Sequence, residues 1–414
     1  MSSTLISGIK CLVNTRQQHY LLRGKALAEL PCIDHAYLII EGAEIAAYGR
    51  MNELDSIPNL PAKRINATEQ FILPAWCDSH THLVFAASRE EEFVSKIKGM
   101  SYAEIAAGGG GILNSAIKLN ATSEEELFNQ AWQRLQELIR LGTGAVEIKS
   151  GYGLTLESEL KILRVIKKLK QQSAISIRST FLGAHTYPIE FKENHQGYID
   201  CILHEMLPVI AREKLADYID VFCETGFFSP ADTITICNAG KQLGLKPKIH
   251  ANQLSLSGGV QAGIQLGALS VDHLEIMDDA TTEVLAKSNT IGTLLPTAAF
   301  FLQMPFQPAR KLIDADCAIA LASDYNPGSS PSGNMNLVVS MSCIQLKMLP
   351  EEAINAATLN GAYAMELENE VGSITVGKKA NLIFTKPIPS LAYLPYAFGT
   401  NLIDRVMING ELVV

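Results

Sequence analysis

The sequence predicts an α/β protein: a TIM-like (β/α)8 barrel whose two chain ends join in a small composite β-sandwich. Three observations predict this fold. From residue 70 onward, short apolar runs alternate with longer amphipathic stretches, which is the pattern of repeated strand–helix units. The segments before and after that region carry hairpin signals. Histidines and one aspartate recur where apolar runs end, at the edge where a parallel barrel gathers its functional side chains.

The predicted barrel strands are apolar runs of strand length. A strand that helices cover reads as a nearly continuous apolar segment, because both of its faces are buried. Eight such strands are the number that closes this type of barrel. The runs cover residues 71–78, 144–149, 175–183, 218–224, 246–250, 268–273, 291–296 and 318–324.

The stretches between these runs predict helices by their own pattern. Ser123 and Glu126 have the spacing of a capping box, and apolar residues then recur at helical spacing until Gly142. The next unit repeats the pattern over 160–169, with lysines on the opposite face. We expect these helices to coat the outside of the barrel.

The two chain ends predict a separate sheet. Residues 3 to about 68 include AYLIIEGAEIAAYG, and residues 372–414 include GSITVGKKANLIFTK and DRVMINGELVV, all with glycine or Asn-Gly turns. Neither end is large enough to form a stable sheet alone, so we expect them to pair. The expected domains are a sandwich of 1–68 with 370–414 and a barrel of 69–369.

Charge and composition exclude several classes of protein. The formal net charge is -9, and no stretch concentrates lysine and arginine as a nucleic-acid surface requires. No segment approaches the roughly 18 apolar residues of a membrane span, and the first twenty residues lack the pattern of a signal peptide. Eight cysteines lie far apart, which is typical of free thiols in a reducing compartment. We expect a cytoplasmic protein with no nucleic-acid or membrane partner.

Five of the nine histidines lie at or just past the ends of predicted strands, as does one aspartate. A lone His-x-His is as often structural as functional. His80 and His82 are two apart on a strand, however, so they point to the same side, and the others recur at the same phase of later units. The set therefore predicts a site at the barrel mouth; it consists of His80, His82, His185, His250, His273 and Asp324.

Three imidazoles and one carboxylate form a ligand set that suits Zn²⁺ and also accepts Fe²⁺ or Mn²⁺. Such a site lowers the pKa of a bound water from about 15.7 toward roughly 7. Asp324 can then carry the water proton to a leaving nitrogen. His273 is the best placed group to polarise a scissile carbonyl. The predicted ligands are His80, His82, His250 and Asp324.

Several sequence strings resemble the amidohydrolase superfamily. They are FILPAWCDSHTHL at the first strand, KIHANQL, SVDHLE and SDYNPGSS at the last. Within that superfamily, EIKSGYGL, FLGAHTYP and SDYNPGSSP together resemble the members of histidine degradation that open an imidazolone ring. The resemblance runs over nearly the whole chain. It implies hydrolysis of the cyclic amide of 4-imidazolone-5-propanoate to N-formimino-L-glutamate.

The resemblance also implies the site and the assembly. It implies one Zn or Fe ion per subunit on His80, His82, His250 and Asp324, catalytic roles for Asp324, His273 and His185, and a homodimer. It does not decide whether His273 or His185 dominates in polarising the carbonyl. The substrate contacts that it implies are Arg89, Tyr102, Tyr152, His185, Gln253, Asn326, Gly328 and Ser329.

The residues themselves agree with most of these substrate contacts. Arg89 lies in the loop directly after the first metal strand, and a forked guanidinium suits a propionate carboxylate. Its alternative is a pairing with residues 90–92 in a solvated helical turn. Tyr152 lies between two glycines that let a loop approach a ligand closely. Residues 326–329 form a Pro-Gly turn that offers amide and hydroxyl donors, although each could be an ordinary turn residue.

Four other interpretations compete with this one. The glycine run at 106–115 lacks the Lys and Ser/Thr of a phosphate loop, so a lid over the mouth is favoured. Lys149 could be a carbamylated ligand of a second metal, which the complete first set disfavours. A nucleobase deaminase would carry a glutamate where Gln253 stands, and glutamine cannot carry a proton. A non-catalytic scaffold is disfavoured by the intact ligand positions.

Overall fold

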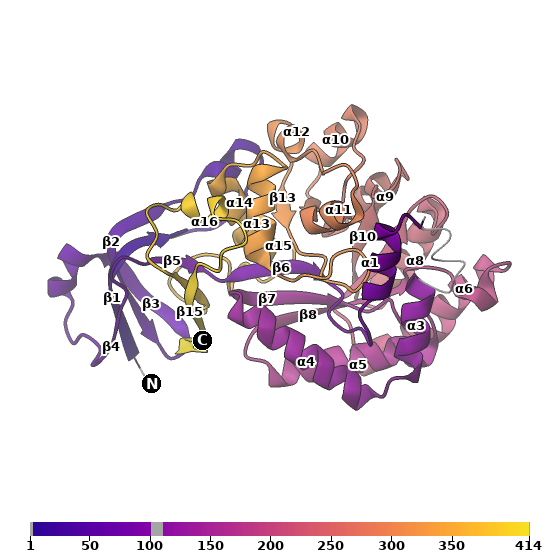
Figure 1. The fold of residues 1–414 in the computed structure, drawn as a ribbon, viewed down its shortest axis with the longest axis horizontal. Helices are drawn as coiled ribbons and strands as arrows, with labels where there is room; N and C mark the ends of the chain where they lie inside the picture. The colour runs from indigo at the N-terminus through magenta and orange to yellow at the C-terminus, as the bar shows by residue number, and fades with distance from the viewer. Residues whose placement is uncertain (1–2, 101–110, 414) are drawn as a thin grey trace.

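The protein, as a computed structural model, is described at residues 3–100 and 111–413, and it contains two sheets that lie side by side (Figure 1). One is the barrel of parallel strands, in which each strand pairs with the next along the chain. This confirms the predicted eight-stranded barrel. Its strands are β6 (Trp76–Thr81), β7 (Thr143–Lys149), β8 (Ser176–Ala184), β9 (Tyr218–Cys223), β10 (Lys246–Ala251), β11 (Ser270–His273), β12 (Ile291–Leu294) and β13 (Ile319–Leu321).

The barrel closes between its last strand and its first. The backbone N–H of Asp324 donates to the carbonyl of His80 at 3.0 Å, and the N–H of His82 donates to the carbonyl of Tyr325 at 2.9 Å. Backbone hydrogen bonds of three predicted metal ligands therefore join the two edges of the sheet. The geometry of the predicted site and the closure of the barrel depend on the same few residues.

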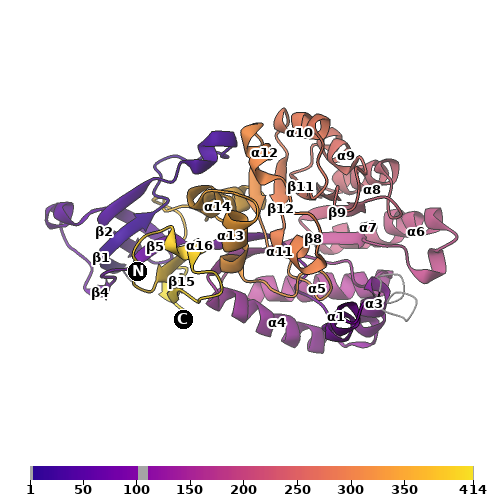
Figure 2. The ribbon, with the colours of Figure 1, turned by 45° about the horizontal axis from the view of Figure 1, so that its top comes forward.

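Helices cover the outside of the barrel, as Figure 2 shows from a second side. In the longest ones the predicted periodicity holds: Ser123 accepts the N–H of Glu126, and the apolar face of α4 is buried. The helices are α1 (Glu90–Ile97), α3 (Ile112–Ala121), α4 (Glu124–Arg140), α5 (Leu156–Gln172), α6 (His195–Cys201), α7 (Leu207–Glu213), α8 (Pro230–Gln242), α9 (Gly259–Leu266), α10 (Asp279–Ala286), α11 (Pro296–Leu302), α12 (Ala309–Asp314), α13 (Met335–Ile344), α14 (Pro350–Ala357), α15 (Leu359–Tyr363) and α16 (Tyr393–Tyr396).

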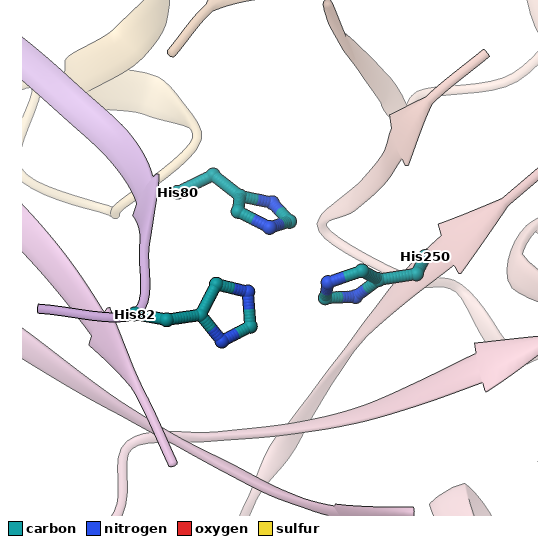
Figure 3. A group of neighbouring side chains, drawn as sticks. All are labelled: His80, His82 and His250. Carbon is teal, nitrogen blue, oxygen red and sulfur yellow. The ribbon is translucent and has the colours of Figure 1, made fainter. Parts of the chain in front are cut away.

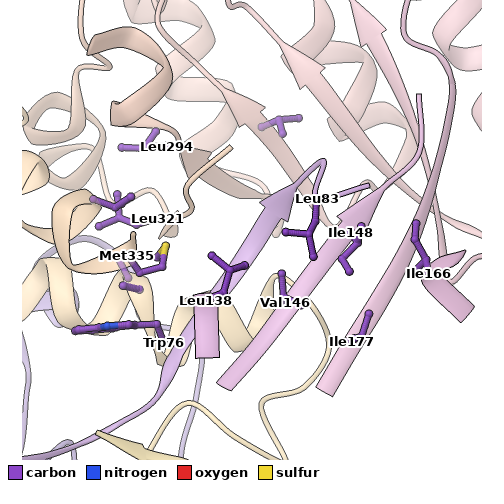
Figure 4. Close-up of a cluster of buried hydrophobic side chains, with 14 of the residues drawn as sticks. Trp76, Leu83, Leu138, Val146, Ile148, Ile166, Ile177, Leu294, Leu321 and Met335 are labelled. Atoms are coloured by element: carbon purple, nitrogen blue, oxygen red, sulfur yellow. The ribbon is translucent and has the colours of Figure 1, made fainter. Parts of the chain in front are cut away.

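The main core lies between the strands and these helices. Val146 and Ile177 of neighbouring strands face Leu138 of α4 and Ile166 of α5, and all four are at most 3% exposed (Figure 4). Burying a large aliphatic side chain contributes about 1.5–3 kcal/mol. The core thus fixes the strand ends, and with them the side chains at the barrel mouth.

The second sheet combines both chain ends. Backbone hydrogen bonds from Ile45 to Lys378 and from Ala380 to Ala43 fold it over a core of its own. This confirms the composite sheet that the hairpin patterns predicted. Its strands are β1 (Ser3–Val13), β2 (Cys32–Glu41), β3 (Glu44–Arg50), β4 (Lys63–Asn66), β5 (Phe71–Pro74), β14 (Leu382–Thr385), β15 (Ile403–Ile408) and β16 (Glu411–Leu412).

The run 71–78, predicted as one barrel strand, is two strands. Strand β5 pairs with β1 and β14 in the second sheet, and β6 opens the barrel. The chain changes sheets at Ala75, whose N–H donates to Asn381, while the next N–H, of Trp76, donates to Gly142. Both strands are fully buried, so the apolar run shows no break. The domain limits, 1–68 with 370–414 and 69–369, stay a proposal. That division assigned β5 to the barrel, whereas β5 belongs to the second sheet.

Among the described residues, no helix has the length and apolarity needed to span a membrane. All eight cysteines are free, as the sequence predicts.

One close approach inside the fold predicts a stability effect. Gly361 of α15 packs on the backbone of β6, and an added Cβ would meet the carbonyl oxygen of Cys77. Because backbone cannot turn aside as a side chain can, we expect Gly361→Ala to lower the free energy of unfolding by about 1–3 kcal/mol. Urea unfolding followed by circular dichroism measures it. An unchanged midpoint would contradict the packing of α15 on β6.

Candidate metal centre

The site lies at the mouth of the barrel, where strands from opposite sides bring their last residues together. His80 is the second-last residue of β6 and His82 follows that strand directly, His250 is on β10, and His273 is the last residue of β11. Asp324 follows β13. Figure 3 shows the imidazoles of His80 and His82 facing that of His250 across the mouth.

The distances between these side chains are those of atoms that can share one cation. The ligand atoms of His80, His82 and His250 lie within 4.8 Å of one another, and so do those of His80, His273 and Asp324. Asp324 Oδ1 is 3.5 Å from Nε2 of His80 and 3.6 Å from Nε2 of His82. Nε2 of His80 and of His250 is buried without a hydrogen-bond partner. An unsatisfied buried nitrogen is costly, and a divalent ion would satisfy both.

The protonation of the two paired histidines suits ligation. Burial lowers the pKa of His80 well below its usual range, and the charge of Lys149 adds to that. Burial and the neighbouring His185 do the same to the pKa of His82. Both imidazoles are therefore neutral at physiological pH and carry a lone pair for a metal. Burial raises the pKa of Asp324, although the charges of His273 and His250 oppose it.

Two carboxylates that the sequence analysis missed stand behind the ligands. Asp272 Oδ2 accepts Nδ1–H of His80 at 2.7 Å, which leaves Nε2 with the lone pair. Asp220 Oδ1 accepts the backbone N–H of His250 at 3.1 Å. Its Oδ2 lies 3.0 Å from Nδ1 of the His250 imidazole, but the two atoms are not aligned for a hydrogen bond. Such partners orient metal-binding histidines. The available signal was a single aspartate inside each apolar run, YIDVFC and SVDH.

Two residues of the site have backbones in the left-handed region. The φ angle is 87° at His273 and 52° at Asp324. This conformation is uncommon for residues other than glycine, and it persists only where surrounding contacts enforce it. Here the carbonyl of Asp324 accepts the amide of Asn326 at 2.6 Å, and its Oδ2 accepts the hydroxyl of Ser329 at 3.1 Å. The loop after β13 thus holds the Asp324 carboxylate in place.

A cavity of about 360 Å³ opens directly over these residues. It includes every predicted substrate contact within the described residues. Its apolar walls, and Lys96 as a second cation, were not predicted from the sequence, because no motif marks them. The lining consists of His82, Arg89, Lys96, Ile112, Tyr152, His185, Phe222, Phe227, His250, Gln253, Leu254, His273, Leu302, Met304, Asp324, Asn326, Gly328 and Ser329.

Arg89 fits both of its sequence interpretations. Its Nε and Nη2 donate to Glu92 Oε2 at 2.9 and 2.5 Å, which is the local pairing with α1. The guanidinium also lines the cavity, and the backbone of Gly328 lies against it. The Glu92 carboxylate accepts the N–H of Gly111 as well. Pairing with Glu92 therefore fixes the plane of the guanidinium. In that orientation the group still lines the cavity and can contact a ligand there.

Tyr152 and His185 form another part of the cavity wall. The His185 ring lies parallel to that of His82, with centroids 5.4 Å apart, and Tyr152 contacts both. His185 Nδ1 donates to the carbonyl of Gly151 at 3.0 Å. Burial, with the charge of His250, lowers the pKa of His185 to about 3. The ring is neutral, so its Nε2 is an acceptor.

Buried glutamates that sequence reasoning missed shape the loops of the cavity. Glu159 accepts three backbone N–H groups of the Tyr152 loop at 2.7–3.1 Å. Glu224 accepts the N–H of Leu254 at 2.9 Å, next to Gln253. A carboxylate can satisfy several N–H groups of a tight turn at once.

His273 has a carboxylate partner of its own. Its Nδ1 lies 3.3 Å from Oε1 of Glu275, and that oxygen also accepts the amide of Gln307 at 2.9 Å. Burial opposes a charge on His273, but Glu275, Asp324 and Asp272 together outweigh burial and raise its pKa. His273 is thus better able to hold a proton than His80, His82 or His185.

Two sequence interpretations fall on residues that are not described. Tyr102 lies outside the described residues. Residues 106–110 of the expected lid also lie outside the described residues. The rest of that stretch consists of Gly111, which is the N-cap of α3, and the first turn of that helix.

Gly328 carries a test of the Arg89 position. An added Cβ there would meet the guanidinium that Glu92 holds. Overpacking of this kind costs about 1–3 kcal/mol, so we expect Gly328→Ala to raise KM about tenfold. The comparison is steady-state kinetics in the Arg89→Met background, where the same substitution should cost clearly less. An equal cost in both backgrounds would show that Gly328 acts without Arg89.

Both the sequence and the fold are similar to those of known proteins. The model of the amidohydrolase family matches residues 71–413. A curated imidazolonepropionase of Flavobacterium johnsoniae is 57% identical and covers 99% of this chain and 100% of its own. That of Christiangramia forsetii is 55% identical, with 99% of each chain covered. The chain belongs to the imidazolonepropionases, within the amidohydrolase family.

A more distant imidazolonepropionase and two solved structures are also similar to this chain. The imidazolonepropionase of Thermoanaerobacter pseudethanolicus is 41% identical over 93% of this chain and 91% of its own. A guanine deaminase of E. coli has a TM-score of 0.75 at 14% identity, covering 100% of this chain and 99% of its own. A zinc-bound adenosine deaminase of Xanthomonas campestris has a TM-score of 0.70 at 16% identity, covering 99% and 92%. At these identities the deaminases share the fold alone.

Proposed function

We propose that this chain hydrolyses the ring C–N bond of 4-imidazolone-5-propanoate to give N-formimino-L-glutamate, with a divalent ion at the histidine cluster. One observation carries the proposal: the same cavity has a buried cluster of imidazoles and a carboxylate at its floor and a guanidinium on its wall. A cyclic amide with a propionate tail needs both. Full-length relatives named imidazolonepropionase, at 55–57% identity, support the same substrate.

His80, His82, His250 and Asp324 would hold the ion. When bound, the ion supplies Lewis acidity and lowers the pKa of a water molecule. Asp324 accepts a proton from the attacking water and passes it to the ring nitrogen that leaves. Ser329 holds one of its carboxylate oxygens, so the other stays directed toward the histidines. Arg89 binds the propionate carboxylate and orients the ring.

His273 and His185 take different parts in this proposal. His273, whose pKa is raised by its carboxylate neighbours, donates a proton or hydrogen bond to the carbonyl oxygen. His185 is neutral, and its Nδ1–H is already used on Gly151, so its Nε2 accepts a hydrogen bond from a ring N–H of the substrate. This assigns carbonyl polarisation to His273.

The main alternative is deamination of a nucleobase. Gln253 lines the cavity at the position where a deaminase would need a proton-carrying glutamate. Its amide can hydrogen-bond a substrate but cannot shuttle a proton. The residue therefore favours ring hydrolysis.

The decisive experiment offers the purified protein 4-imidazolone-5-propanoate and, separately, cytosine and guanine. We expect loss of the imidazolone absorbance, abolished by a chelator and restored by added metal, with no ammonia from either base. Ammonia release from a base, or full turnover by metal-free protein, would overturn the proposal.

We further propose one zinc or iron ion per subunit, a homodimer, and a cytoplasmic setting. The ligand set accepts both metals. Elemental analysis of protein purified without added metal tests the ion and its number, and light scattering tests the dimer. Two ions per subunit, or a monomer at assay concentration, would contradict these points.

A further inference from the structure

A group of buried charges fills the barrel directly beneath the site. Lys149 and Lys248 and three carboxylates, of Glu147, Asp220 and Asp272, are all at most 1% exposed. Burying charges is costly unless each one is paired, so the arrangement of the pairs is specific. The metal site as described uses only the two aspartates, and the proposed reaction gives no role to the lysines.

Lys149 contacts both carboxylates that stand behind metal ligands. Its Nζ donates to Asp220 Oδ2 at 2.8 Å and lies 3.6 Å from Asp272 Oδ2. These are the same two oxygens that face Nδ1 of His250 and of His80. A third contact, with Glu147 Oε1 at 2.6 Å, holds the ammonium from below. One cation therefore fixes the oxygen that faces each ring.

We propose that Lys149 is a positioning residue of the metal centre: it holds Asp220 and Asp272 so that His250 and His80 present Nε2 to a single divalent cation. The inference rests on the metal centre of the proposed function. Without the ammonium, the two neighbouring carboxylates would repel each other and turn apart. That change removes the hydrogen bond that orients His80 and the carboxylate that faces His250.

The geometry also bears on a second metal. In this structure Nζ of Lys149 is engaged with three carboxylates and is a hydrogen-bond donor to two of them. A carbamylated Lys149 would be an anion among those carboxylates, which like-charge repulsion opposes. Lys149 thus takes an orienting part here and leaves a centre for one ion.

Lys248 is a matched control. It is equally buried and also pairs with Glu147, but its other polar contacts are the carbonyls of Ser79 and Ala364, at 3.1 and 3.2 Å. Lys248→Met therefore removes a buried lysine, whose charge also lowers the pKa of Asp272, without removing a direct contact to the two oxygens that face the imidazoles. Both variants lose one charge and gain a side chain of similar volume.

The test measures zinc affinity of the full-length apoprotein by competition with a chromogenic chelator, alongside thermal unfolding of the apoprotein. We expect Lys149→Met to weaken zinc binding by about 10–100-fold, the range for partners of metal-binding histidines, and Lys248→Met to weaken it much less. Asp272→Asn should weaken it too, and the double variant Lys149→Met/Asp272→Asn should lose less than the product of the single losses.

Unchanged or tighter zinc binding by Lys149→Met, or equal losses in both lysine variants, would overturn the inference. If Lys149→Met does not fold, Lys149→Arg and Lys149→Gln replace it. The arginine variant keeps the positive charge and must then bind zinc more tightly than the glutamine variant. An equal or reversed order would again overturn it. A wild-type chain that binds no zinc, iron or manganese would instead sink the proposed function, so the two failures are distinguishable.

Discussion

Replacing Asp324 by asparagine is expected to reduce kcat by about 10²–10⁴-fold, the range for removing a general acid–base group. The amide keeps the shape of the carboxylate and can still accept the hydroxyl of Ser329. It cannot accept a proton from water. The effect should therefore fall on kcat, with KM changed far less.

Metal content separates the two roles of Asp324. If the variant still binds a full complement of metal, the loss reports the missing proton shuttle, and if the metal is gone the loss reports ligation. Asp314→Asn, on an exposed carboxylate of α12, is the matched control and should leave kcat within about twofold. An Asp324→Asn enzyme with wild-type kcat and bound metal would contradict the proposed mechanism.

Replacing Arg89 by methionine is expected to raise KM by about 10–100-fold, because a hydrogen bond to a charged group contributes about 1.5–3 kcal/mol. Methionine keeps much of the apolar stem that lines the cavity. Metal content should not change, since Arg89 is not among the clustered ligand atoms. Steady-state kinetics with elemental analysis measures both.

A substrate analogue provides the control for Arg89. A 4-imidazolone without the propionate group should bind wild type and Arg89→Met equally, since the lost contact is to the carboxylate. If the variant loses the same factor with that analogue, Arg89 acts on the ring or on the cavity wall, and its assignment to the carboxylate is wrong.

Much of the fold follows from local pattern. The helix over residues 124–140 could be predicted from its cap, its apolar spacing and the following glycine, each of which acts within a few residues. The same holds for most barrel strands. The prediction of one strand over 71–78 was wrong, because a strand buried on both faces is an apolar run whichever sheet it belongs to.

Candidate site residues were predictable where chemistry and phase coincide. His80 and His82 lie two positions apart at the end of one strand, and the other ligands recur at strand ends, so a barrel brings them to one mouth. Lys96 and the apolar cavity wall could not be predicted in this way. Their side chains have no distinctive chemistry until the helices that carry them are placed over the strands.

By itself, the sequence determined the strand–helix repeat, the composite sheet from the two chain ends and the clustering of histidines with Asp324, since these depend on periodicity and residue type. Tertiary structure decided to which sheet β5 belongs. It also decided that Asp272 hydrogen-bonds His80, which lies 192 positions away. It also decided that Lys149 joins the two carboxylates behind the ligands. The physical reason is that a buried charge is stable only beside partners that folding brings from distant segments, and no local pattern encodes those neighbours.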